Sequence, residues 1–199
     1  MRRFAEAVGE ILKGISDAME KVDPENVEDL VNELIRAHDE GRRVMVVGAG
    51  RSSLVGRAFA MRLMHLGLNV YVLGETINPS VADGDIVLVI SGSGSTALPV
   101  TVAEMAKKLG VRVLAMTSNP ESPLGKLADL TVVVPGRSKA AREDEYHSRQ
   151  LLGEHESLTP MGTLFENSSM VFLDSLIAEL MDRLGVSEDE MKRRHAAIE

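Results

Sequence analysis

Residues 85–96 read DIVLVISGSGST, and this stretch decides the fold. The apolar residues from Ile86 to Ile90 show no alternation with polar ones, which is typical of a strand covered on both faces, as in a parallel sheet. A turn of serines and glycines follows, and it opens a predicted helix over 96–109. A buried strand, a glycine-rich turn and a helix together form the repeating unit of an α/β protein.

The same unit recurs on both sides of this stretch. Short apolar runs at 44–47, 69–73, 111–116 and 130–134 predict four more strands, and a helix is predicted over 52–66. Apolar spacing predicts two helices before any strand, at 2–20 and 24–41, a long helix opening at 159–160 and reaching 184, and a short one after a capping box at 187–190. We therefore expect one domain over 1–199: a three-layer, doubly wound sheet of five parallel strands in flavodoxin-type order.

Composition excludes several classes of function. The chain has no cysteine, which rules out disulfides, thiolate-ligated metals and a cysteine nucleophile. Its 30 acidic and 22 basic residues give a formal charge of -8, which argues against a nucleic-acid partner. No run approaches the ~18 apolar residues of a membrane span, so we expect a cytoplasmic protein without a membrane partner. A small phosphorylated ligand remains compatible with this charge, because one helix N-terminus can hold a phosphate.

Two glycine-rich turns predict an anion site. GAGRSS (48–53) follows the first strand and SGSGST (91–96) follows the third. These two strands are commonly neighbours in a doubly wound sheet, so both turns would face one crevice with their backbone N–H groups. A purely structural turn is the alternative for each. The first turn also resembles a dinucleotide fingerprint, and Glu75 could then meet a ribose, but Ser53 stands where the third glycine is required.

Glu166 is the candidate general base. It is expected within the second turn of the long helix, among apolar neighbours that would raise its pKa toward neutrality. Taken alone, such a residue is more often a solvated glutamate that benefits from the helix dipole. The five histidines lack a metal-binding spacing, so no metal site is expected. His147 and His155 lie in a charged segment, 136–157, interpreted as a loop or lid, and His195 lies in a basic tail.

Taken together, GAGRSS, AFAMRLMHLG, GET, SGSGST, LTPMGTLFE and RRHAAIE resemble the sugar-isomerase (SIS) domain, and more narrowly the 6-phospho-3-hexuloisomerases. The resemblance spans nearly the whole chain. It implies a cofactor-independent interconversion of D-arabino-3-hexulose 6-phosphate and fructose 6-phosphate, a reaction of the ribulose monophosphate pathway. It also implies a homo-oligomer, with a tetramer favoured, in which a neighbouring subunit completes each active site.

The resemblance also assigns residues. Glu166 would be the base, and His195 would match a terminal histidine of the family that reaches into its own or a neighbouring site. The substrate-binding residues would be Arg51, Ser52, Ser91, Gly92, Ser93, Gly94, Ser95 and Thr96. The alternative is a phosphosugar sensor of the same fold without catalytic activity, which would bind the sugar with or without an intact Glu166.

Overall fold

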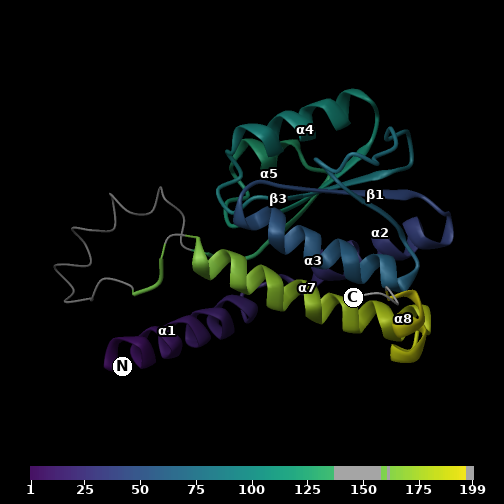
Figure 1. Ribbon diagram of the computed structural model, residues 1–199. Coiled ribbons are helices and arrows are strands. Elements are labelled where there is room, and N and C mark those ends of the chain that lie inside the picture. Colours follow the sequence, from purple (N-terminus) through teal and green to yellow (C-terminus); the bar gives the residue numbers. More distant parts are fainter. Residues whose placement is uncertain (137–157, 161, 196–199) are drawn as a thin grey trace.

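The computed structural model describes residues 1–136, 158–160 and 162–195 (Figure 1). Its five strands are all parallel and form one sheet with the order β2-β1-β3-β4-β5. The strands are β1 (Arg43–Gly48), β2 (Asn69–Val72), β3 (Ile86–Ile90), β4 (Arg112–Thr117) and β5 (Leu130–Val133). The fold class, the number of strands and their order are as the sequence predicts. Since β1 and β3 pair directly, the turns that follow them are neighbours.

Helices cover both faces of the sheet. They are α1 (Arg2–Met19), α2 (Pro24–Asp39), α3 (Arg51–Leu66), α4 (Ala97–Lys108), α5 (Pro123–Leu127), α7 (Thr163–Leu184) and α8 (Glu188–Arg194). Figure 1 shows α4 and α5 on one face and α2, α3 and α7 on the other. Among the described residues, no helix is both long and apolar enough to cross a membrane.

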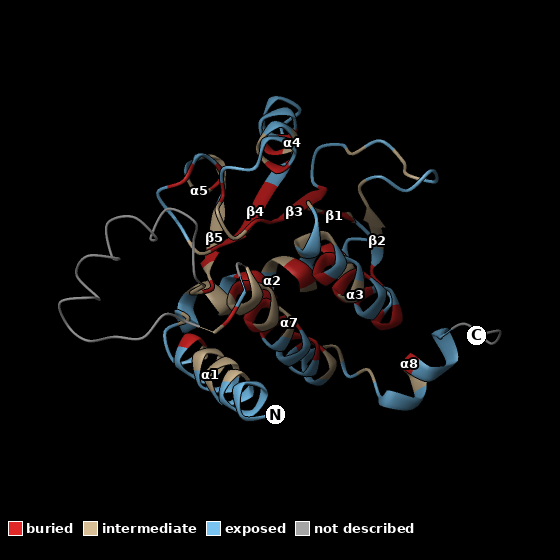
Figure 2. Cartoon of the chain, turned by 60° about the vertical axis from the view of Figure 1, so that its left-hand side comes forward, coloured by how far each residue is buried: buried red, intermediate tan, exposed pale blue. Residues whose placement is uncertain are grey.

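Alternate residues of β1, β2, β3 and β4 belong to two separate cores. In β1, Val44 and Val46 pack with α2, α3 and α7, whereas Met45 and Val47 pack with α4 and α5. The central strand β3 is buried at every position, which Figure 2 shows as continuous red. The unbroken apolar runs in the sequence therefore reflect burial on two faces, since a strand presents successive side chains to opposite sides.

Two helices differ from the sequence-based expectation. The long helix α7 begins at Thr163 rather than near residue 160, because Gly162 has a φ of +87°, which is incompatible with the helix. Glu166 is therefore in the first turn of α7. The short helix α5 was not predicted, although Ser122 and Pro123 supply the signal of a helix start. The Ser122 side chain accepts a hydrogen bond from the Gly125 N–H, at 3.2 Å.

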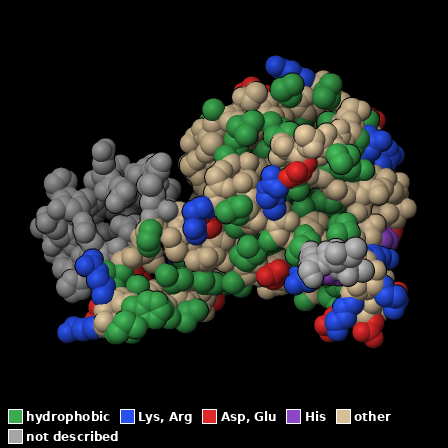
Figure 3. Space-filling model, in the orientation of Figure 1, with side chains coloured by type: hydrophobic (Ala, Val, Ile, Leu, Met, Phe, Trp, Pro, Cys, Tyr) green, Lys and Arg blue, Asp and Glu red, His purple; other side chains and the backbone are tan. Residues whose placement is uncertain are grey.

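The first helix, α1, projects from the body of the molecule. Ala18, near its end, is its only buried residue. Several apolar residues farther out along α1 remain exposed; for example, Phe4 is 66% and Leu12 is 63% exposed. Hydrophobic side chains accordingly gather on the surface over α1 in Figure 3. An apolar helix face of this size that is open to water is typical of a surface that meets another protein.

Candidate active site

The crevice lies at the carboxyl ends of β1 and β3. The GAGRSS turn connects β1 to α3, and the SGSGST turn connects β3 to α4. The strands are paired from Val44 with Ile86 to Gly48 with Ile90, so both turns leave the same edge of the sheet. In doubly wound sheets this is the switch point at which ligands bind, since α3 and α4 leave for opposite faces.

The first turn, GAGRSS, is held by hydrogen bonds within the turn itself. Gly50 precedes α3 with a φ of +57°, and the Ser53 hydroxyl donates to the Gly50 carbonyl at 2.6 Å. A Cβ on Gly48 would lie 2.8 Å from the Ser53 nitrogen, so glycine permits the helix to start this close to the strand. The Ser52 hydroxyl makes no hydrogen bond within the described residues. Of the two serines, Ser52 is therefore the one available to a ligand.

The second turn, SGSGST, divides into a structural part and an open part. Ser91 is 5% exposed. Gly94 has a φ of +61°, and a Cβ there would lie 1.9 Å from the Ser122 Oγ, so this residue lets the turn pack on α5. Ser95 and Thr96 are exposed on the open part.

Ser93 organises the open part of this turn. Its Oγ accepts the Ser95 N–H at 3.3 Å and lies 3.4 Å from the Thr96 Oγ1. The hydroxyls of Ser93 and Thr96 thus lie together in front of α4, beside the Ser95 N–H. Hydroxyls and backbone N–H groups at the start of a helix form a suitable cradle for a phosphate group.

Glu166 is brought to the same crevice by α7. A Cβ on Gly92 would lie 2.8 Å from the ring of Phe165, so the SGSGST turn packs directly against the first turn of α7. The Glu166 side chain is 12% exposed, and the Nε of Arg51 donates to its Oε2. Arg51 is the first residue of α3. Its guanidinium therefore joins the GAGRSS turn to the carboxylate, although the two residues are 115 positions apart in the sequence.

The three helices that meet here share one feature. Within the described residues, α3, α4 and α7 begin without a hydrogen bond from an N-cap side chain. The first N–H groups of a helix have no partners inside the helix and carry a partial positive charge. The crevice therefore presents the positive ends of three helices to a bound anion.

His195 lies far from this crevice within its own chain. Its ring packs on that of His65, with 5.1 Å between ring centroids, and the neighbouring Arg194 donates to the His65 carbonyl at 2.9 Å. His65 is near the end of α3, whereas Arg51 begins it. At 1.5 Å per residue the two positions are about 21 Å apart. The structure therefore brings together every predicted site residue except His195; His147 and His155 lie outside the described residues.

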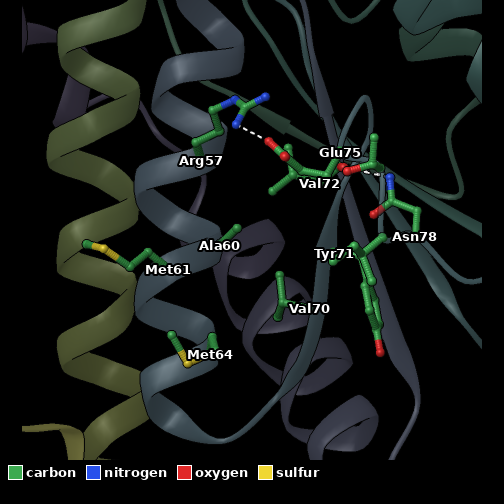
Figure 4. A pocket seen from close by; sticks show the side chains of 11 residues that line it. Arg57, Ala60, Met61, Met64, Val70, Tyr71, Val72, Glu75 and Asn78 are labelled. Atoms are coloured by element: carbon green, nitrogen blue, oxygen red, sulfur yellow. Dashed lines mark hydrogen bonds and ion pairs between the residues drawn. The ribbon is translucent and has the colours of Figure 1, made fainter. Parts of the chain in front are cut away.

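Glu75, the candidate ribose ligand of the dinucleotide alternative, is engaged in an ion pair. Arg57 of α3 donates to its carboxylate at the rim of an apolar hollow between α3 and β2 (Figure 4). Met61, Met64 and Val70 line this hollow, which has a volume of about 440 Å³. Arg57 was not predicted to pair with Glu75, since no local pattern relates two residues 18 positions apart. Within the described residues, no three metal-ligating side chains form a cluster.

Comparison with known proteins identifies the family of the chain. The model of the SIS domain matches residues 38–147. The 3-hexulose-6-phosphate isomerase of Mycobacterium gastri is 43% identical over 93% of this chain and 86% of its own length, and that of Bacillus subtilis is 37% identical over 99% and 100%.

Solved structures agree as well. One is the structure of a Methanococcus jannaschii protein that was inferred to be a 3-hexulose-6-phosphate isomerase. It is 33% identical to this chain and has a TM-score of 0.76, and the match covers 100% of both chains. The chain therefore belongs to the SIS domain family, and its full-length relatives place it among the isomerases of that family.

Proposed function

We propose that the protein interconverts D-arabino-3-hexulose 6-phosphate and D-fructose 6-phosphate without a cofactor. One observation carries the proposal: the partly buried carboxylate of Glu166 lies at the crevice where two phosphate-cradling turns meet. A phosphorylated sugar held by the turns would extend its carbon chain toward this carboxylate. The names of full-length relatives, which are 3-hexulose-6-phosphate isomerases, support a hexulose phosphate as the substrate.

The phosphate is bound between the starts of α3 and α4. Ser52 donates from the first turn, and Ser93, Ser95 and Thr96 donate from the second, together with the backbone N–H groups of both. Arg51 supplies the positive charge. Because a phosphate monoester carries roughly -1.5 to -2 charges near neutrality, each of these contacts is a charge-assisted hydrogen bond. The binding energy of this remote group then positions the reacting carbons.

Glu166 moves the proton. The substrate has its carbonyl at C3 and a hydrogen on C2. Glu166 removes the C2 proton, and the electron pair of the C–H bond forms the double bond of an enediolate across C2 and C3. The hydroxyl proton passes from O2 to O3, and Glu166 returns its proton to C3, which leaves the carbonyl at C2. The enediolate oxygen is stabilised by N–H donors of the SGSGST turn or by a protonated His195.

In this proposal His195 acts from a neighbouring subunit of a homo-oligomer, with a tetramer favoured. Its ring packs on His65, which lies about 21 Å along α3 from Arg51 at the crevice, and this supports the assignment. The exposed apolar faces of α1 and α3, which include Phe4, Leu12 and Leu54, supply surfaces for association. We place the reaction in the cytoplasm, within the ribulose monophosphate pathway.

The proposal is tested by incubating the protein with D-arabino-3-hexulose 6-phosphate in deuterated water and following fructose 6-phosphate by NMR. Product with deuterium at C3 is expected, because the carboxyl proton exchanges with solvent. Absence of product would overturn the proposal. Binding of the sugar phosphate by both the native protein and Glu166→Gln, without turnover in either, would identify a sensor instead.

A further inference from the structure

Gly162 lies directly beneath the proposed base. It precedes the first residue of α7 with a φ of +87°, and its carbonyl accepts the Glu166 N–H at 3.0 Å. The residue therefore fixes the backbone of Glu166 through the first hydrogen bond of the helix. A positive φ favours glycine, but it does not by itself distinguish a structural glycine from one that serves the site.

The surroundings of the Gly162 α-carbon make that distinction. A Cβ at this position would lie 2.9 Å from Oε1 of Glu166, 3.4 Å from its Cδ and 3.5 Å from Oε2. The carboxylate thus folds back over the start of its own helix and rests on the bare α-carbon. From another direction, the Nε of Arg51 donates to Oε2. The carboxylate is therefore held between two elements, α3 and the start of α7.

We infer that Gly162 is a positioning residue: its missing side chain forms the space that sets where the Glu166 carboxylate lies. This inference rests on the proposed function, since it assumes that Glu166 is the base. It adds a second requirement, because a glutamate at position 166 would then be insufficient without a glycine at position 162. Arg51 and Gly162 together determine which way the carboxylate faces.

The consequence of adding a methyl group follows from what it would meet. The atoms in its way belong to the far end of a flexible side chain, so the carboxylate would move and the helix would stay in place. A displacement of about 1 Å at a reacting group can lower turnover about 100-fold. The phosphate cradle lies on α3 and α4, so substrate binding should be little affected.

Gly185 provides a matched control at the other end of the same helix. It follows α7 with a φ of +64°, and a Cβ there would meet no atom within 4 Å. Alanine at either position carries the strain of a left-handed backbone, which is about 1–2 kcal/mol. Gly162→Ala and Gly185→Ala should therefore lower the melting temperature by similar amounts, while only the former meets the carboxylate.

The experiment measures kcat, KM and melting temperature for both variants with fructose 6-phosphate as substrate. We expect Gly162→Ala to lower kcat about 10- to 100-fold with KM nearly unchanged, and Gly185→Ala to change kcat less than about twofold. Equal kcat values in the two variants would overturn the inference. If the two variants have equal kcat values while Glu166→Gln is inactive, the inference about Gly162 fails and the proposed function stands. If Glu166→Gln is active, Glu166 is not the base, and the proposed function fails as well.

A second pair of variants covers the case in which Gly162→Ala fails to fold. Asparagine adopts the left-handed conformation more readily than alanine but carries the same Cβ, so Gly162→Asn and Gly185→Asn repeat the test with less backbone strain. A double-mutant cycle with Glu166→Asp tests whether the loss of kcat depends on contact between residues 162 and 166, because the shorter side chain withdraws the carboxylate from position 162. Gly162→Asn should then lower kcat less in the Glu166→Asp background than in the native one. Equal losses in both backgrounds would contradict the inference.

Discussion

Helix starts at the crevice differ from the starts of α2 and α8. At the crevice, α3, α4 and α7 begin without a side-chain cap from the described residues. Away from it, Asp23 accepts the Glu25 N–H at 2.9 Å at the start of α2, and Ser187 and Glu190 form a complete capping box at the start of α8. Glu28 near the start of α2 pairs with Arg183, close to the end of α7, which places α2 far from the first turn of that helix.

This difference teaches where the chain gives up stability in favour of binding. A side-chain cap is worth about 1 kcal/mol to a helix. Omitting it leaves N–H donors and the positive end of the dipole available, and a bound phosphate would then act as the cap. The starts of α2 and α8, away from the crevice, carry such a cap themselves.

The largest expected effect is at the start of α7. Glu166→Gln keeps the size of the side chain and removes the proton acceptor, so kcat should fall about 10²- to 10⁴-fold, the usual contribution of a general base. KM should change little, because the phosphate is held elsewhere. Glu104→Gln, on the exposed face of α4, is the control and should retain native kinetics. Native turnover in Glu166→Gln would assign the proton transfer to another group.

The next effect comes from giving the crevice a cap. Thr96 precedes α4 with φ -67° and ψ 129°, which is the geometry of a capping residue. Thr96→Asp should raise KM about 100-fold, because a carboxylate about 4 Å from the phosphate costs a few kcal/mol at an effective dielectric near 20. The same variant should raise the free energy of unfolding by a few tenths to about 1 kcal/mol.

Thr96→Asn separates charge from capping, because its amide oxygen can cap α4 without repelling the phosphate. It should stabilise the fold to a similar extent and raise KM much less. Kinetics and urea unfolding of the two variants check both statements. An unchanged KM in Thr96→Asp would show that the phosphate is not bound at the start of α4.

Removing a cap away from the crevice should have the opposite outcome. Asp23→Ala deletes the acceptor for the Glu25 N–H, so the free energy of unfolding should fall by about 1 kcal/mol and the melting temperature by about 2–4 °C. Turnover should stay native, since this helix start has no role in binding. Calorimetry and a kinetic assay on the same preparation test the pair of statements, and a loss of kcat without a loss of stability would contradict them.

The smallest expected effect is a dependence on pH at the start of α8. Hydrogen bonds from the backbone N–H and the hydroxyl of Ser187 hold the pKa of Glu190 below its ordinary value. A carboxyl group whose pKa is lower in the folded state contributes stability above its unfolded pKa, and this contribution is lost as the pH falls through the folded pKa. The native protein and Glu190→Gln should therefore differ in stability at pH 7 and converge in acid. A constant difference in urea midpoints down to acidic pH would contradict this.

Much of the fold was predictable because local rules and burial agree. The unbroken apolar run of β3 and the glycine-rich turn after it predicted a parallel sheet, and the structure confirms five strands in the expected order. The start of α7 was predicted three residues too early, since a proline is a common first helical residue but does not compel a helix. The five-residue helix α5 was missed because so short a segment gives no periodic pattern.

The site was only partly predictable. Both turns could be placed together, because the first and third strands of a doubly wound sheet are usually neighbours. The ion pair of Arg51 with Glu166 could not be predicted, since no spacing rule relates residues so far apart in the chain. The packing of Phe165 on Gly92 is equally long-range and is what carries Glu166 to the crevice.

The sequence by itself determined the layers, the turns and the chemistry that the turns can offer, because hydrophobic period and glycine placement act over a few residues. Only the tertiary structure decided which side chains face one another: Arg51 with Glu166, the carboxylate with the bare carbon of Gly162, and His195 with His65 rather than with its own crevice. The physical reason is that such contacts depend on how helices pack across the sheet, and that packing is fixed by the whole core.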